Sequence, residues 1–162
     1  MNKEFAHRDL KPENVVVDLG ERELFIIDYG LAMSVDGRDE MVHGYVGTDG
    51  FTAPEVGDDW KERYYSPIAA DLWATGEVLE FLLYLSDHPK SPALTRLLWI
   101  SKRLLDDDPE KRPGADNALD YILRRAKQSF NNSSERSRSS QKDHSYSKQC
   151  AQRSSPRRAL LY

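Results

Sequence analysis

The chain has 162 residues, 39% of them hydrophobic, and a formal net charge of −4, which together indicate one globular domain with an additional segment. Its single cysteine, Cys150, excludes a disulfide framework and favours a reducing compartment. No apolar stretch precedes the first motif, so we expect no signal peptide and an intracellular protein, either cytoplasmic or nuclear.

The first predicted element is a polar turn that Asp9 and Asn14 bracket. Pro12 fixes the backbone between them and disfavours a helix at this point. Residues 15–17 are all β-branched and predict a short buried strand, with residues 24–27 as its antiparallel partner.

The six residues between these strands are polar and include a glycine, as expected of a hairpin connection. The hairpin places Asn14 at the start of one strand and Asp28 at the end of the next. Antiparallel pairing therefore brings these two side chains to the same end of the hairpin.

Asn14, Asp28 and Asp9 together offer oxygen ligands of the kind that Mg²⁺ prefers, with substrate phosphates completing the coordination. Asp9 is placed to receive a hydroxyl proton, and Lys11 to neutralise charge on a transferring phosphoryl group. The alternative is a chance acidic loop in which Asp28 caps a turn. The length of the whole phrase, residues 7–14 followed by residues 28–30, favours phosphoryl transfer.

Three helices follow in the predicted order. Residues 68–85 are apolar nearly all round, which predicts a buried central helix. Three acids interrupt this stretch, so it falls short of a membrane span and we expect no membrane association. Residues 94–105 and 115–126 predict amphipathic helices, the latter starting after Pro113.

From about Phe5 to about Ala126 the sequence resembles the C-terminal lobe of a protein kinase of the eukaryotic serine/threonine type. Four phrases carry the resemblance in the family's order: His7–Asn14 with Asp28–Gly30, Gly47–Glu55, Asp71–Gly76, and Asp107–Pro113. The resemblance implies an α+β, mainly α-helical fold with a small β-hairpin beside the catalytic loop. We accordingly expect a partial kinase domain over residues 1–127, while the change in composition near Lys127 predicts a disordered tail over residues 128–162.

The resemblance implies ATP and Mg²⁺ as cofactors, a protein hydroxyl as substrate, and specific roles for the residues of the loop. Asp9 is expected to be the catalytic base, Lys11 the phosphate contact, and Asn14 a further member of the catalytic group. The expected nucleotide and metal contacts are Lys11, Glu13, Asn14, Val16 and Asp28, with Asn14 and Asp28 holding the metal.

Structural roles follow from the same resemblance. Glu55 of the docking phrase is expected to form an ion pair with Arg112, and Asp71 to hold the backbone of the catalytic loop. Removing one member of a buried pair leaves an uncompensated charge, which costs about 3–5 kcal/mol.

Thr48 is expected to hydrogen-bond to Asp9 and Lys11 rather than to serve as a phosphorylation site. Arg8 is of the kind that clamps a phosphate on the activation loop. Where the family often carries a phosphorylatable threonine, this chain has Gly44. The only hydroxyls nearby before Thr48 are those of Ser34 and Tyr45.

The family's glycine-rich loop, strand lysine and helix glutamate are not found upstream of the catalytic phrase in these 162 residues. We therefore expect weak transfer by the chain alone. The alternatives are a non-catalytic binding module and a truncated gene copy. An apolar surface around Trp73, Phe81 and Leu85 is expected to be exposed, and an N-terminal lobe or another protein to cover it.

Residues 128–162 contain ten serines and seven lysines and arginines against two acids. The tail is thus about +5 and the preceding residues about −9. It has too little apolar content to fold, so we predict disorder. A nucleic-acid contact is the alternative to a solvated linker, and the linker is favoured because such short basic motifs are weak signals.

Overall fold

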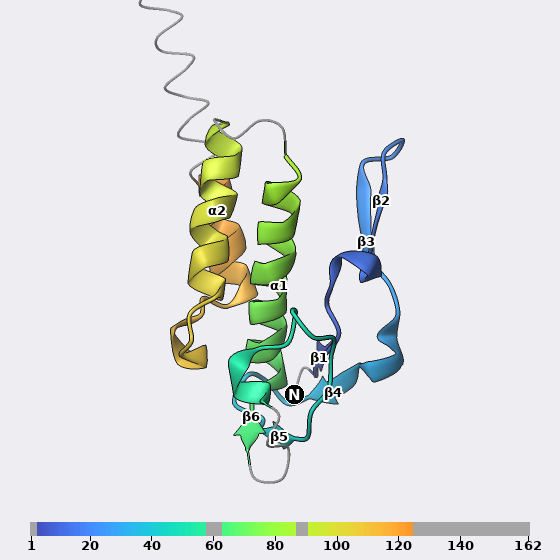
Figure 1. Ribbon diagram of the computed structural model, residues 1–162, viewed down its shortest axis with the longest axis vertical. Coiled ribbons are helices and arrows are strands. Elements are labelled where there is room, and N and C mark those ends of the chain that lie inside the picture. Colours follow the sequence, from blue (N-terminus) through green and yellow to red (C-terminus); the bar gives the residue numbers. More distant parts are fainter. Residues whose placement is uncertain (1–2, 58–62, 87–90, 125–162) are drawn as a thin grey trace, which may run out of the picture. The chain divides into compact units, whose positions relative to one another are not determined.

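The computed structural model describes residues 3–57, 63–86 and 91–124. Within these ranges, small antiparallel strand pairs in the N-terminal part are followed by three helices, as Figure 1 shows. The strands are β1 (Glu4–Ala6), β2 (Val15–Asp18), β3 (Glu23–Ile26), β4 (Met33–Val35), β5 (Val42–His43) and β6 (Tyr64–Tyr65). The helices are α1 (Pro67–Tyr84), α2 (Pro92–Leu104) and a last helix over residues 115–124.

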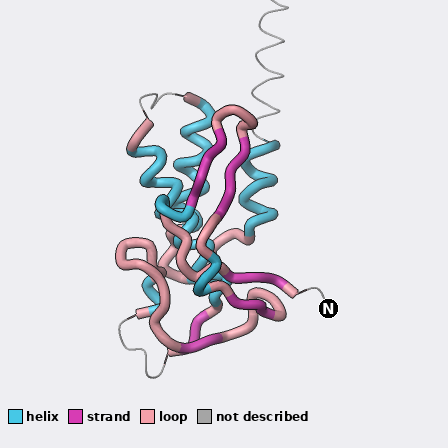
Figure 2. The backbone as a smooth tube through the Cα atoms, turned by 90° about the vertical axis from the view of Figure 1, so that its right-hand side faces the viewer, coloured by secondary structure: helices cyan, strands magenta, loops and turns pink. Residues whose placement is uncertain are grey.

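Three separate antiparallel pairs organise the N-terminal part, visible as the magenta segments of Figure 2. β1 pairs with β4, β2 with β3, and β5 with β6. The predicted hairpin is confirmed, with Val15 opposite Ile26. The Asp18 carboxylate closes the connection between the two strands, because it accepts hydrogen bonds from the backbone N–H groups of Gly20 and Glu21.

The prediction that the hairpin strands are buried is wrong. Side chains on both faces of the ribbon are 39–59% exposed: Val16, Val17, Leu24, Phe25 and Ile26. In Figure 1 the hairpin stands apart from α1. An apolar run leads to burial only where another layer packs over it, and among the described residues no layer covers this two-stranded ribbon.

Helix α1 begins where the sequence predicts. The Ser66 hydroxyl accepts a hydrogen bond from the Ala69 N–H as the N-cap, and Pro67 occupies the first helical position. Gly76 permits close packing, because a Cβ there would lie 2.8 Å from Leu105. The last described helix and α2 pack on α1 through a core cluster of Leu72, Ile100 and Leu104, with Leu79, Ala118 and Ile122 around it.

The prediction of exposed apolar surface on α1 is confirmed for Phe81 and Leu85, which are 42% and 59% exposed. It is wrong for Trp73, which is only partly exposed and packs against a cluster of Ala53, Val56 and Tyr65. The Arg112 guanidinium also lies 5.0 Å from the Trp73 ring centroid. Trp73 differs from Phe81 and Leu85 because residues that precede α1 in the sequence pack over the N-terminal half of the helix and not over its C-terminal half.

Within the described residues, no helix combines the length and apolarity that crossing a membrane requires. The predicted tail over residues 128–162, and with it the domain boundary at residue 127, lies outside the described residues.

Candidate active site

The entry to the catalytic loop is held by α1. Asp71 Oδ2 accepts a hydrogen bond from the His7 N–H at 2.5 Å, and Oδ1 accepts one from the Arg8 N–H at 2.8 Å. These bonds support Arg8 in the left-handed region, at φ 67°, which is unusual for a residue with a side chain. Burial raises the pKa of Asp71, and the Arg8 and His7 N–H groups partly oppose that rise. The predicted contact of Asp71 with the loop backbone is therefore present.

His7 links the catalytic loop to the segment after the hairpin. Its ring is 6% exposed, with Nε2 3.0 Å from the Ile27 carbonyl oxygen and Nδ1 accepting a hydrogen bond from the Asp9 N–H. These partners favour the tautomer with the proton on Nε2. The Tyr29 ring packs 5.0 Å away. His7 is thus a packed part of the loop scaffold, as the sequence predicts.

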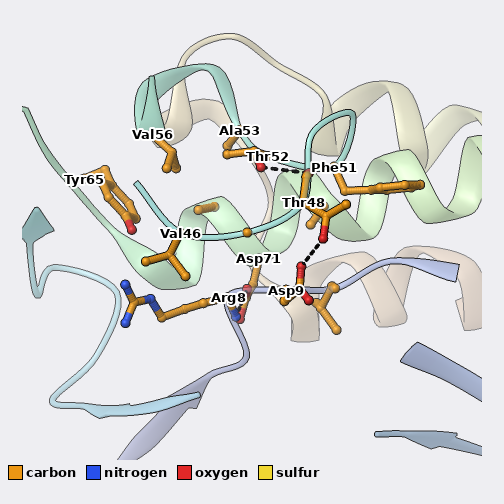
Figure 3. A pocket seen from close by; sticks show the side chains of 14 residues that line it. Arg8, Asp9, Val46, Thr48, Phe51, Thr52, Ala53, Val56, Tyr65 and Asp71 are labelled. Carbon is orange, nitrogen blue, oxygen red and sulfur yellow. Dashed lines mark hydrogen bonds between the residues drawn. The ribbon is translucent and has the colours of Figure 1, made fainter. Parts of the chain in front are cut away.

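Asp9 lies at the centre of a hydrogen-bonded group, of which Figure 3 shows the bond to Thr48. Oδ1 accepts a hydrogen bond from the Thr48 hydroxyl at 2.6 Å, and the Lys11 ammonium lies 3.0 Å from Oδ2. Lys11 also donates to the Thr48 oxygen at 2.8 Å. The Asn14 amide nitrogen donates to the Asp9 carbonyl at 2.8 Å and lies 3.4 Å from its carboxylate. The predicted contacts of Thr48 are confirmed.

Two opposing effects set the pKa of Asp9. Partial burial is the largest single influence and raises the pKa, but the hydrogen bonds from Thr48, Lys11 and Asn14 together outweigh it. The pKa is therefore lowered below its ordinary value. The consequence is a carboxylate that stays ionised at neutral pH with both oxygens oriented.

The two predicted metal ligands meet at the base of the hairpin. Asn14 is buried in the 3₁₀ turn Pro12–Asn14, and its carbonyl accepts a hydrogen bond from the Ile27 N–H at 2.9 Å, next to Asp28. Asp28 has φ 63° and its carboxylate accepts a hydrogen bond from the Gly30 N–H at 3.4 Å. Asp28 therefore caps the turn Tyr29–Leu31, which the sequence analysis kept as its alternative role.

Asn14 and Asp28 offer too few oxygen ligands to hold a cation by themselves. They fit a magnesium ion whose coordination is completed by substrate phosphates. The Asn14 nitrogen is occupied by Asp9, which leaves its amide oxygen to bind a hard cation, and the Asp28 carboxylate is exposed. In the described part of the chain, no group of three or more His, Cys, Asp and Glu side chains is arranged to hold a metal ion. Of the predicted nucleotide contacts, Glu13 and Val16 are exposed and Lys11 is partly buried.

The phrase Gly47–Glu55, called the docking segment below, is attached to the C-terminal part of the fold. Arg112 is 2% exposed and its two terminal nitrogens reach the Glu55 carboxylate oxygens at 2.5 and 2.7 Å. Arg112 also donates to the carbonyls of Ala69 and Asp106, each at 2.9 Å. The predicted Glu55–Arg112 ion pair is confirmed and is bidentate.

The docking segment packs directly over the catalytic loop. Figure 3 shows Val46, Thr48 and Phe51 on one side of a small cavity and Arg8 and Asp9 on the other. The cavity has a volume of about 20 Å³, enough for about one water molecule. The close packing explains how the Thr48 hydroxyl comes to lie on Asp9 across 39 residues of sequence.

The sequence analysis missed Ser66 and Arg38 as supporting residues. Ser66 caps α1 and its hydroxyl donates to the Arg38 carbonyl at 2.6 Å. A serine followed by proline before an apolar run is a helix-start signal that identifies the cap. The side-chain contact of Arg38, to the carbonyl of Pro109, spans 71 residues and has no local signal.

Comparison with known proteins identifies the class of this fold and site. The sequence profile of the protein kinase domain family matches residues 1–95, which is more than half of the chain. The chain therefore belongs to the protein kinase domain family.

Its relatives include CBL-interacting protein kinases of Oryza sativa subsp. japonica. The putative CBL-interacting protein kinase 13 of Oryza sativa subsp. japonica is 35% identical over an alignment of 138 positions that covers 70% of this chain. CBL-interacting protein kinase 16 of the same organism is 44% identical over 80 positions, 48% of this chain, and kinase 19 is 35% identical over 127 positions, 65% of this chain. The chain spans 26%, 17% and 24% of the lengths of these relatives.

Proposed function

We propose that residues 1–127 are the C-terminal lobe of an ATP-dependent serine/threonine protein kinase, and that they carry its phosphoryl-transfer residues. The observation that carries this proposal is the group formed by Asp9, Lys11, Asn14 and Thr48, in which both Asp9 oxygens are hydrogen-bonded and the carboxylate is held ionised. Positioning and charge stabilisation account for most catalysis of phosphoryl transfer, so such a group is what the reaction requires.

Asp9 would orient the hydroxyl of a serine or threonine substrate and would take its proton as the hydroxyl oxygen bonds to the γ-phosphorus of ATP, while the bond from that phosphorus to the bridging oxygen breaks and ADP leaves. Thr48 and Lys11 fix the two carboxylate oxygens, so Asp9 presents its remaining lone pairs in one direction. Lys11 keeps a positive charge next to this point, where it offsets negative charge on the transferring group.

Asn14 and Asp28 would hold Mg²⁺, and Lys11, Glu13 and Val16 would contact the nucleotide. When bound, Mg-ATP supplies the phosphoryl group and the positive charge that neutralises its oxygens. The backbone bond between Asn14 and Ile27 keeps the two metal ligands at one end of the hairpin.

The segments that clamp the nucleotide from above, a glycine-rich loop and a strand lysine, would be contributed by other polypeptide. That polypeptide is either a preceding part of a longer protein or a partner chain. The protein would act inside the cell, since its single cysteine offers no disulfide. Its substrates would be proteins.

A chimera tests the proposal directly. The segment of CBL-interacting protein kinase 16 that precedes its catalytic loop is joined to residue 1 of the full 162-residue chain, and transfer of labelled phosphate to a general protein substrate is measured with Mg-ATP. We expect the chimera to transfer phosphate to the protein substrate. Asp9→Asn should lower the rate of transfer by about a hundredfold or more. The matched control, Asp18→Asn, makes the same change at an exposed hairpin acid and should leave transfer unchanged.

The second candidate is a non-catalytic binding module. The uncovered apolar residues of the hairpin and of the end of α1 favour it, because such a patch invites a partner. A chimera that folds cooperatively and binds ATP, but transfers no phosphate, would support this candidate and exclude the kinase proposal for the chain.

A further inference from the structure

Residues 36–47 connect β4 to the docking segment, and Arg38 attaches them to two distant elements. The Arg38 guanidinium, through Nη2, donates a hydrogen bond to the Pro109 carbonyl. The Arg38 carbonyl accepts a hydrogen bond from the Ser66 hydroxyl at 2.6 Å. One half-buried residue therefore contacts partners 28 and 71 residues away in the sequence.

Both partners of Arg38 belong to the support of the candidate active site. Ser66 caps α1, the helix whose Asp71 holds the entry to the catalytic loop. Pro109 begins the 3₁₀ turn Pro109–Lys111 that leads into Arg112, the residue that holds Glu55. Arg38 thus lies beside the anchor of the catalytic loop and beside the anchor of the docking segment.

Further contacts within and around residues 36–47 support the attachment at Arg38. The Asp36 N–H donates to a Glu40 carboxylate oxygen at 2.5 Å, and the β5–β6 pair holds Val42 against Tyr65. The buried Tyr65 hydroxyl donates to the Gly44 carbonyl at 3.1 Å. The position at which a phosphorylatable threonine is often found therefore contributes only its backbone.

Arg8, the arginine suited to bind a phosphate, makes none of the contacts that hold residues 36–47. Arg8 Nε is buried, and in the described part of the chain it has no hydrogen-bond partner. Between Arg38 and Thr48 the only side-chain hydroxyl is that of Tyr45, which hydrogen-bonds to the Asp49 carboxylate. The segment is thus held at Arg38, Val42 and Gly44, none of which has a hydroxyl that could carry a phosphate.

We propose that Arg38 is a positioning residue, which holds residues 36–47 and the docking segment in place without phosphorylation. The regulatory consequence, that the site does not depend on a phosphate on this segment, rests on the proposed kinase function. The positioning role itself is a property of the fold and is measured without catalysis.

Hydrogen–deuterium exchange of the full chain, followed by mass spectrometry, tests the positioning role. Arg38→Met keeps the length and apolar stem of the side chain but removes its donors. We expect residues 39–47 to exchange about tenfold faster, as loss of an arginine hydrogen bond permits, while β2–β3 peptides stay unchanged. Arg38→Lys retains a donor for the Pro109 carbonyl and should restore most of the protection. Arg22→Met makes the same change at the exposed hairpin tip and should alter no peptide in residues 36–47.

The proposal would be overturned if residues 39–47 exchange equally fast in Arg38→Met and in the wild type. It would also be overturned if phosphatase treatment of the wild-type chain removes the protection of residues 39–47 from exchange. If Arg38→Met unfolds the whole chain, hydrogen–deuterium exchange of Arg38→Lys is the deciding measurement. Wild-type protection in that variant supports the role, and protection as poor as in the Met variant refutes it.

The kinase chimera adds a readout that a general loss of stability would not produce. Arg38→Met should raise KM for the protein substrate severalfold, because the docking segment is displaced, and leave KM for ATP unchanged. A chimera with no activity in any variant would refute the proposed function while leaving the exchange result intact. Equal KM values for protein substrate in wild type and Arg38→Met would refute a catalytic consequence of the positioning.

Discussion

The Glu55–Arg112 ion pair offers the sharpest test of how this fold is held together. Arg112 is 2% exposed, and its side chain makes bonds to the Glu55 carboxylate, to the Ala69 carbonyl and to the Asp106 carbonyl. Glu55→Ala removes the carboxylate that forms an ion pair with this guanidinium, so a buried charge is left without its partner. Such a loss costs about 3–5 kcal/mol, a large part of the total stability of a domain.

The two single variants should be coupled. Arg112→Met removes the charge but leaves the Glu55 side chain, which is 16% exposed and retains some water. The double variant Glu55→Ala/Arg112→Met leaves neither charge stranded, so it should cost about 1–3 kcal/mol less than the sum of the single variants. Urea denaturation of the full chain at neutral pH gives all the free energies of unfolding that this cycle needs.

A matched control separates this buried pair from surface charge effects. Lys111→Met breaks the exposed Lys111–Asp108 pair one residue away and should cost far less stability than the loss of the buried pair, because solvent screens exposed charges. If Glu55→Ala is no more destabilising than Lys111→Met, or if the effects of the two single variants on the free energy of unfolding are additive, the buried pair does not hold the docking segment.

Three further predictions concern the site and the core. Thr48→Val should cost about 1.5–3 kcal/mol at neutral pH by removing a hydrogen bond to an ionised group, measured by urea denaturation. The lowered pKa of Asp9 means that this contribution is complete above its unfolded pKa of about 3.9 and is lost as pH falls through the lower folded pKa; a cost independent of pH would contradict it. Asp71→Asn should leave either the His7 or the Arg8 N–H without an acceptor, and exchange of those two amides, followed by NMR, should accelerate; unchanged protection would show that Asp71 does not hold the loop. Gly76→Ala should destabilise by about 1–3 kcal/mol, because its Cβ would meet Leu105 at 2.8 Å; a neutral or raised Tm would show that α1 and the turn after α2 separate freely.

The local elements and their order follow from the sequence alone. A run that is apolar nearly all round predicts α1, and amphipathic patterns predict α2 and the last helix. Two apolar runs around a polar connection with a glycine predict the hairpin, because these features depend on neighbours a few residues apart. The resemblance to the protein kinase family also predicts the contacts of Asp71, Thr48 and the Glu55–Arg112 pair, all of which are present.

Only the tertiary structure determines which side chains are buried and which distant residues meet without a signal in the sequence. The strand at Val16 is exposed and Trp73 is partly covered, the reverse of what was predicted, since burial depends on which other element packs over a side chain. Arg38 meets Pro109 for the same reason: the two are 71 residues apart, and no pattern in either segment specifies the other. Local sequence determines the elements and the chemistry of the candidate site, whereas the packing of distant segments determines what supports it.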